Sequence, residues 1–194
     1  MATGTDTYPV KFEVDYVDEH DRLTSFFRLL WGIPILVVLC LLASGEGAGI
    51  AGAVAVMIIF RQRYPRWWFN FSLEMTRFST RVFAYLFLLT DKYPSTTDKQ
   101  SVRLDIEYPD AEHGLNRWLP IVKWLLAIPH YVVLAFLIVG AILAAIFAWF
   151  SILFTGRYPK GLFDYVVGVM RWGNRVNAYA FLLATDKYPP FSLS

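Results

Sequence analysis

The chain has 194 residues, of which 56% are hydrophobic and 18% charged, and its formal net charge at pH 7 is +2. Soluble domains are typically about half apolar and a quarter charged, so this composition argues against an ordinary soluble domain and for a membrane protein. The small net charge argues against nucleic-acid binding. The single cysteine, Cys40, excludes an intrachain disulfide and a metal site built on several thiolates.

The sequence is a tandem duplication. Asp-Lys-Tyr-Pro occurs at 91–94 and again at 186–189, and Arg-Tyr-Pro occurs at 63–65 and 157–159. The other pairs of similar segments are separated by nearly the same number of residues. We therefore predict two membrane repeats, residues 8–98 and 100–194.

Each repeat begins with a short alternating segment. Val10, Phe12 and Val14 share one face of residues 9–16, and charged residues occupy the other face; residues 102–108 repeat the pattern. This period of two predicts one half-buried strand per repeat. The two strands are expected to pair with each other or with partner chains.

A long apolar block follows each strand, at residues 26–60 and 118–154. A membrane-spanning helix needs about 20 residues, so each block has room for two helices. We expect turns at 45–47 and near 139–140. The predicted fold class is thus an all-α membrane protein with four transmembrane helices in two hairpins, together with amphipathic interfacial helices and short β-strands.

Basic residues follow both apolar blocks, whereas the expected hairpin tips carry none. The excess of cations on the cytoplasmic side of membrane proteins then predicts a multi-pass protein with both termini in the cytoplasm. The two repeats would share one orientation, related by an axis along the membrane normal.

The third segment of each repeat, residues 67–89 and 162–184, has a helical period and one polar stripe. This pattern favours a helix lying in the membrane interface over a third spanning helix. Four arginines lie in the stripes, two per repeat and one helical turn apart: Arg77, Arg81, Arg171 and Arg175.

These arginine pairs are the candidate sites for anions or lipid headgroups, because a guanidinium group suits a phosphate. Glu74 is placed to pair with Arg77, whereas Gly168 occupies the equivalent place before Arg171. The second pair is therefore expected to be the stronger anion site. The alternative interpretation is that the arginines form internal ion pairs with the strand segments.

Three further polar features lie in or beside the apolar blocks. His130 is the candidate intramembrane polar residue, and the favoured interpretation is a neutral imidazole bonded to a carbonyl freed by Pro129. Arg28 and Lys123 are expected to extend toward the membrane surface. The Asp-Lys-Tyr-Pro segments are expected to end helices, and His20 and His113 to be solvated.

Several of these segments together resemble a known family. Residues 26–34, Leu-Ala-Ile-Pro-His at 126–130 and Asp-Lys-Tyr-Pro-Pro-Phe-Ser-Leu at 186–193 resemble a bacterial membrane-protein family defined only as a domain of unknown function. That family occurs singly in some bacteria and in tandem in actinobacteria. The first copy departs from it, with Ile35 in place of the histidine. The resemblance implies the bacterial inner membrane and two copies, and it supplies no activity, ligand or catalytic residue.

No catalytic motif or metal-ligand spacing is present, so we expect no enzyme activity, no cofactor and no metal. The favoured function is a non-catalytic membrane accessory or scaffold protein that docks other membrane-protein subunits, a second copy of itself, or anionic lipids of the bilayer. The runner-up is a carrier or channel for a lipid or small molecule at the repeat interface. An enzyme acting on lipid phosphates comes third.

Overall fold

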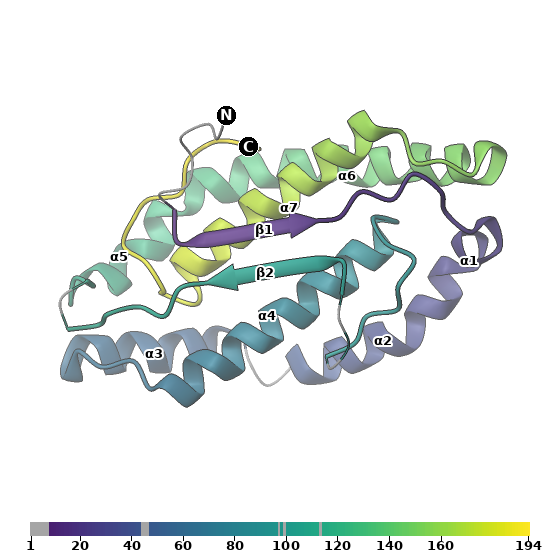
Figure 1. Cartoon of the computed structure of the whole chain (residues 1–194). Helices are drawn as coiled ribbons and strands as arrows, with labels where there is room; N and C mark the ends of the chain where they lie inside the picture. Colours follow the sequence, from purple (N-terminus) through teal and green to yellow (C-terminus); the bar gives the residue numbers. More distant parts are fainter. Residues whose placement is uncertain (1–7, 44–46, 97, 99, 113) are drawn as a thin grey trace.

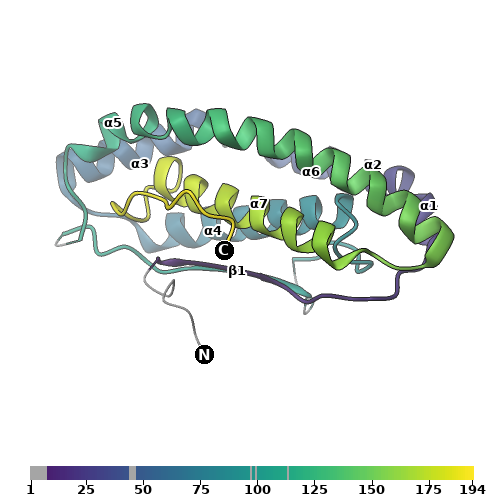
Figure 2. The same cartoon turned by 90° about the horizontal axis from the view of Figure 1, so that it is seen from above.

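The computed structural model describes residues 8–43, 47–96, 98, 100–112 and 114–194. The described chain is mostly helical and has a small two-stranded sheet. The elements form three layers, seen most clearly in Figure 2: the sheet, a middle layer of α4 and α7, and an outer layer that contains the apolar helices.

The two repeats contribute matching helices. The first repeat provides α1 (Arg22–Phe26), α2 (Arg28–Ala43), α3 (Gly47–Arg61) and α4 (Arg66–Leu86), and the second provides α5 (Leu119–Leu126), α6 (Ile128–Thr155) and α7 (Lys160–Ala180). The repeated prolines Pro65 and Pro159 stand at the N-caps of α4 and α7. The turn before each proline contains a residue in the left-handed backbone conformation, which is Gln62 in the first repeat and Gly156 in the second.

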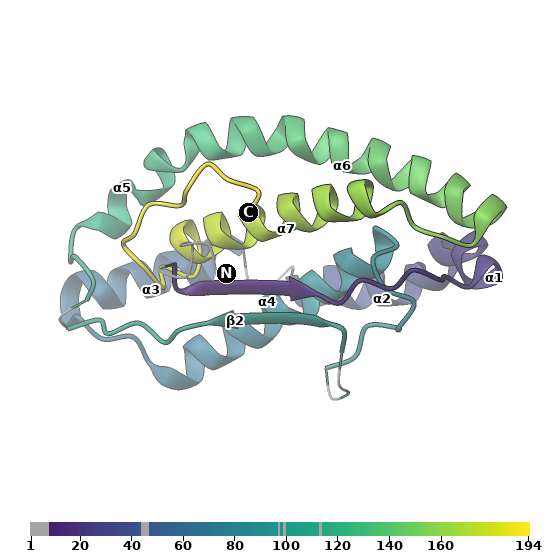
Figure 3. The same cartoon turned by 45° about the horizontal axis from the view of Figure 1, so that its top comes forward.

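The predicted hairpins are wrong. In the second repeat, α6 continues without a turn through residues 139–140. In the first repeat, α3 leads away from α1 and α2 instead of returning alongside α2 (Figures 1 and 3). Residues 44–46, where most of the first turn was expected, lie outside the described residues.

The prediction of four spans is corrected as well. Among the described residues, one helical stretch, Leu119–Thr155, is long and apolar enough to cross a membrane. The apolar helices Arg28–Leu42 and Ala51–Arg61 are shorter. The helix that folds back in each repeat is the amphipathic one, α4 or α7, which follows the apolar block.

The predicted strands are present, and they pair with each other. β1 (Val10–Val14) and β2 (Val102–Ile106) form an antiparallel pair in which Phe12 lies opposite Leu104. The strands are exchanged between repeats, since β1 packs on α7 and β2 packs on α4. These two helices cover the apolar face of the sheet.

The exchange makes the structure a pseudo-twofold dimer of repeats. Phe12 and Leu104 are equivalent positions of the two copies, and so are Thr80 of α4 and Asn174 of α7. Thr80 Oγ1 donates to Asn174 Oδ1 at 3.0 Å. The pseudo-twofold axis therefore passes through the centre of the sheet and the meeting point of α4 and α7, perpendicular to the layers.

Candidate functional site

The most distinctive polar feature is a buried cation that occurs once in each repeat. In the first repeat, the Arg28 side chain is 2% exposed and forms an ion pair with Asp91. Its Nη1 donates to the carbonyl of Thr90 at 2.6 Å, and its guanidinium carbon lies 4.3 Å from the ring centroid of Tyr85. The cation thereby connects the start of α2 to the end of α4.

The second repeat builds the same cluster around a lysine. Lys123 Nζ lies 2.8 Å from the Asp186 carboxylate and donates to the Thr185 carbonyl at 2.8 Å. It also lies 5.2 Å from the ring centroid of Tyr179. Because the Lys123 side chain is fully buried, the aspartate is its counter-charge.

These clusters correct two predictions. Arg28 and Lys123 do not extend outward, and the Asp-Lys-Tyr-Pro segments do not end the helices, because α4 ends at Leu86 and α7 at Ala180. The reason is the chain path: α4 and α7 return along the apolar helices and deliver each aspartate to the cation of its own repeat. The sequence contains one indication of this pairing: the number of residues between the cation and the aspartate is the same in both copies.

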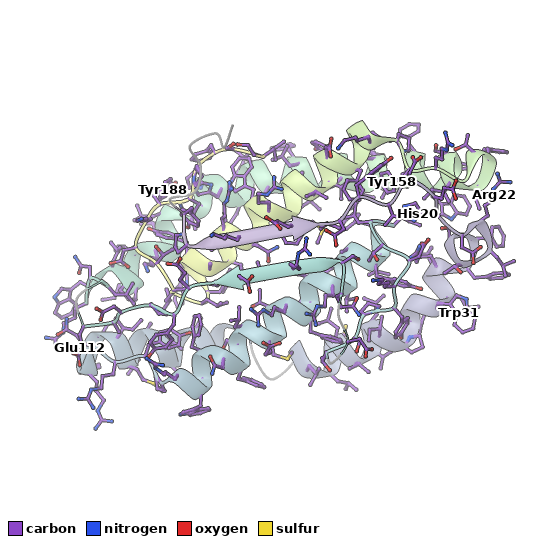
Figure 4. The ribbon with its side chains drawn as sticks, viewed as in Figure 1. His20, Arg22, Trp31, Glu112, Tyr158 and Tyr188 are labelled. Carbon is purple, nitrogen blue, oxygen red and sulfur yellow. The ribbon has the colours of Figure 1, made fainter. Side chains whose placement is uncertain are left out.

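His20 extends the first cluster and is buried, contrary to the expectation that it is solvated. Its Nδ1 lies 3.1 Å from Asp91 Oδ1, and its ring lies near that of Tyr158 (Figure 4). Burial alone would raise the pKa of the Asp91 carboxyl, but the hydrogen bond with His20 and the charge of Arg28 outweigh burial and hold the pKa below its usual value. His113 lies outside the described residues.

His130 is fully buried beside the second cluster. Its Nδ1 accepts a hydrogen bond from Trp172 Nε1 at 3.1 Å, and its ring stacks on Phe191 with centroids 4.0 Å apart. The predicted bond to a freed carbonyl is thus replaced, at Nδ1, by a bond from an indole. The imidazole anchors the chain segment after α7 onto the outer helix layer.

The first arginine of each predicted pair binds the strand of the other repeat. Arg77 Nε donates to the Leu104 carbonyl at 2.7 Å, and Arg171 Nε donates to the Phe12 carbonyl at 3.2 Å. Hydrogen bonds pair Glu107 with Pro9 and Asp15 with Ser101, so the odd-numbered positions of each strand bond to the other strand. The even-numbered positions alternate with them and therefore direct their carbonyls to the outer edges of the sheet. These arginines therefore cap the middle of each free sheet edge.

The second arginine of each pair holds the segment that follows Asp-Lys-Tyr-Pro in its own repeat. Arg81 Nη1 donates to the Ser95 carbonyl at 2.7 Å, and Arg175 Nη2 donates to the backbone oxygen of Ser194 at 2.7 Å. The internal ion pairs of the alternative interpretation occur at Arg77, which also pairs with Asp105. The expected headgroup contacts of the four arginines stay a prediction.

Gly168 explains why the second repeat can hold its last residues in this way. A Cβ atom at this position would lie 2.9 Å from both the Cβ and the backbone oxygen of Leu193. Glycine therefore lets the segment cross α7 at van der Waals distance, where Arg171 also binds the Leu193 carbonyl. In the first repeat Glu74 stands at this position and pairs with Arg77.

A matched pair of glycine substitutions tests this crossing. Gly168→Ala is expected to destabilise the protein by about 1–3 kcal/mol, because the added methyl group collides with Leu193. Gly173→Ala, on the same helix with open space around it, is expected to stabilise by up to about 1 kcal/mol through helix propensity. Unfolding in mild detergent and chymotrypsin cleavage at Phe191 measure both effects. Equal behaviour of the two variants would contradict the close crossing.

A cavity of about 420 Å³ lies where the repeats meet, beside the pseudo-twofold axis. One face of α4 supplies four hydroxyl groups, and the remaining walls come from α3, α7, the residues that follow each of these two helices, and other side chains of α4. The lining residues are Ala51, Val54, Tyr64, Ser72, Met75, Thr76, Ser79, Thr80, Phe83, Asn174, Asn177, Phe181 and Leu182. The cavity is mixed polar and apolar, and none of the described residues that line it is charged.

Within the part of the chain that the structure describes, no three His, Cys, Asp or Glu side chains gather as metal ligands would. The buried ion pairs, the arginine caps and the His130 stack all join segments that are distant in sequence. Their geometry is that of connections that hold the layers together. The cavity at the repeat interface has room for a ligand.

Comparison with known proteins finds one family and no matching curated protein or solved structure. The match falls in two segments, residues 22–97 and 119–192, which agrees with tandem copies. The bacterial source and the membrane location that the resemblance implied stay predictions. Since the two segments cover most of the chain, the protein belongs to the family described as "Domain of unknown function (DUF4389)".

Proposed function

We propose that this protein is a non-catalytic accessory or scaffold protein of the bacterial inner membrane, embedded by its outer helix layer and presenting its sheet to protein partners. The insertion is in-plane: α2, α3, α5 and α6 lie along the membrane surface with their exposed side chains in lipid. This geometry replaces the four spans expected from the sequence.

The exposed surface of α6 is the observation that carries this proposal. The helix is apolar all round, yet it touches the rest of the protein along one narrow stripe. The residues of the stripe are His130, Leu134, Ala141, Ala144, Ala148 and Ile152. Many large side chains outside the stripe are exposed, among them Phe136 at 75% and Phe154 at 79%. A helix of this composition belongs in lipid or in another protein.

The opposite face of the molecule favours in-plane insertion over a spanning α6. β1 and α6 both run along the length of the molecule (Figures 1 and 3). If α6 crossed the bilayer, the exposed charges of Lys11, Glu13 and Asp105 would enter the hydrocarbon. Each charge near the bilayer centre costs at least about 2.5 kcal/mol, and an open sheet edge is not tolerated there. In-plane insertion leaves this face in water.

Exposed cations at both ends of the outer layer fit contact with anionic headgroups. Arg61, Arg63 and Arg117 lie at one end, and Arg22 and Arg157 lie at the other. Figure 4 places Arg22 and Glu112 at opposite ends of the molecule. Each basic residue near an anionic leaflet contributes about 1 kcal/mol of attraction, so we assign lipid contact to these arginines and place the sheet on the cytoplasmic side.

The sheet face is the surface proposed for protein partners. Its outward side chains alternate in sign, and Arg103 lies 2.7 Å from Asp15 and 3.6 Å from Glu13 across the strands. Arg77 and Arg171 each bind the middle carbonyl of one sheet edge, so a partner would not bind by adding a strand. It would instead contact the outward charged side chains of the sheet face. A membrane-protein subunit or a second copy of this chain would have to offer alternating charges.

Site-directed spin labels measured for depth in liposomes separate the two insertions. Labels would be placed at 132, 139, 143 and 150 on the exposed side of α6, with Cys40 replaced by serine. In-plane insertion is expected to give similar, shallow depths at all four positions. A profile that is deepest at the middle and aqueous at both ends would establish a spanning α6 and overturn the proposal.

A charge on the outer layer is expected to weaken membrane binding. Phe147 is 66% exposed on α6, and Phe147→Lys is expected to reduce partition into liposomes roughly tenfold or more because the ammonium must leave water. Glu13→Lys, on the exposed sheet face, is the matched control and is expected to leave partition into neutral liposomes unchanged. Co-flotation with liposomes measures both. Equal losses would argue against membrane contact by α6.

The carrier alternative is favoured by one observation, the cavity of about 420 Å³ at the repeat interface. Pockets of this size accommodate a small molecule or part of a lipid.

A further inference from the structure

We propose that the cavity at the repeat interface binds the uncharged glycerol-ester head of a neutral lipid of the diacylglycerol class, with the acyl chains extending into the bilayer. The inference draws on the proposed function only for the source of this ligand, which is the membrane beside the outer helix layer.

The lining of the cavity selects against a charged ligand. Within the described parts of the chain, none of the residues that line it carries a formal charge. A phosphate or an ammonium group would therefore lose its water without gaining a counter-charge, which is strongly unfavourable. Polar and apolar walls in one cavity instead suit an amphiphile without charge.

The hydroxyl groups of α4 define which polar groups the ligand must offer. Thr76 Oγ1 donates to the Ser72 carbonyl and Ser79 Oγ donates to the Met75 carbonyl, both at 2.8 Å. Their protons are thus used within the helix, and their oxygens remain as acceptors. Ser72 Oγ is buried with no hydrogen-bond partner among the described residues. The site therefore offers acceptors for a ligand hydroxyl, and Ser72 offers a donor for a ligand carbonyl.

Diacylglycerol carries this set of groups. Its free hydroxyl can donate to the oxygen of Thr76 or Ser79, and an ester carbonyl can accept from Ser72. The apolar side chains of Phe83, Phe181 and Val54 line the rest of the cavity and suit the first carbons of the acyl chains.

Comparison of the two repeats argues that the hydroxyl face is not needed for folding. The positions of α7 equivalent to Ser72, Thr76 and Ser79 are Val166, Met170 and Gly173. The same helix thus forms in the second repeat without these hydroxyls, while in the first repeat they collect on the cavity wall. Ser and Thr in helix interiors often bond to the preceding turn without further use, and the test includes that outcome.

Photo-crosslinking tests the site. The protein is reconstituted in liposomes that contain a diacylglycerol with a diazirine near the ester of one acyl chain, irradiated and digested. The label is expected on peptides of α4. Ser79→Phe, which fills the cavity, is expected to reduce this labelling at least fivefold. Thr155→Val is the matched control, because Thr155 makes the same bond to the preceding turn on α6 and does not line the cavity.

Two further measurements keep the test decisive. Thr76→Val preserves shape and removes one acceptor, so it should reduce labelling by a smaller factor even if Ser79→Phe fails to fold. A phosphatidylglycerol with the same diazirine chain should label α4 weakly.

Equal labelling by both lipids, or labelling unchanged in both cavity variants, overturns the neutral-lipid site and leaves hydroxyls that serve only their own helix. Flotation of the same samples reports membrane insertion separately, so failure of the site is distinguishable from failure of the proposed function.

Discussion

Asp186→Asn is expected to lower the free energy of unfolding by about 3–5 kcal/mol, because it leaves the buried Lys123 ammonium without its carboxylate. Asparagine keeps the shape of the side chain, so the loss reports the charge. Unfolding by titration with a denaturing detergent, followed by circular dichroism, measures it. The double variant Lys123→Met with Asp186→Asn is expected to recover most of the loss, since no unpaired buried charge remains.

An exposed pair on the same repeat provides the control. Lys160 Nζ lies 2.8 Å from the Asp164 carboxylate, but both side chains are more than half exposed. Lys160→Met is therefore expected to cost about 0.5 kcal/mol or less. If it costs as much as Asp186→Asn, burial does not determine the strength of these pairs.

Arg28→Met is expected to destabilise the first repeat by a similar amount, about 3–5 kcal/mol, because Asp91 and the Thr90 carbonyl both lose their cation. Arg28→Lys is expected to cost less, about 1–2 kcal/mol, since the second repeat builds the same cluster with Lys123. The same detergent titration compares the variants. An Arg28→Lys variant as unstable as Arg28→Met would contradict the equivalence of the two clusters.

The pH dependence gives an independent check on this cluster. The pKa of Asp91 is lowered in the folded state from its usual value of about 3.8. Its contribution to stability is therefore present above that pH and is lost as the pH falls through the folded pKa. The stability of the wild-type protein is expected to fall as the pH drops below about 4. In the Asp91→Asn variant this fall is expected to be smaller.

The sequence was informative wherever a pattern depended on local geometry. Alternation at Val10, Phe12 and Val14 predicted β1, and the arginine spacing predicted one polar face on α4 and α7. The duplication supplied the equivalence of the two halves. None of these inferences required knowledge of which segments meet in space.

The apolar blocks misled because their length and hydrophobicity do not show where a helix ends: residues 118–154 suggested a hairpin, but α6 runs through residues 139–140 without a turn. Gly140 was read as a turn, but a Cβ there would lie 2.4 Å from the Tyr165 hydroxyl. The glycine thus serves the close packing of α6 on α7 and interrupts no helix. Spacing within one helix cannot report contacts with another.

The polar partners were missed for a related reason. Arg171 binds a carbonyl of β1, and every residue has such a carbonyl, so no sequence pattern identifies this partner. The ion pairs of Arg28 and Lys123 join residues that are distant in the chain. Only their recurrence in both copies could have indicated them.

The exchange of strands indicates how a chain with a single copy of this repeat would behave. Such a chain would leave its strand without the helix that covers it, and two chains would have to associate to form the core. Fusion of the copies replaces that encounter by an intramolecular one with a high effective concentration. Fusion also removes a restriction. Two identical chains would place two identical residues together on the axis, whereas the fused chain places Thr80 against Asn174. Its two halves are therefore free to acquire different functions.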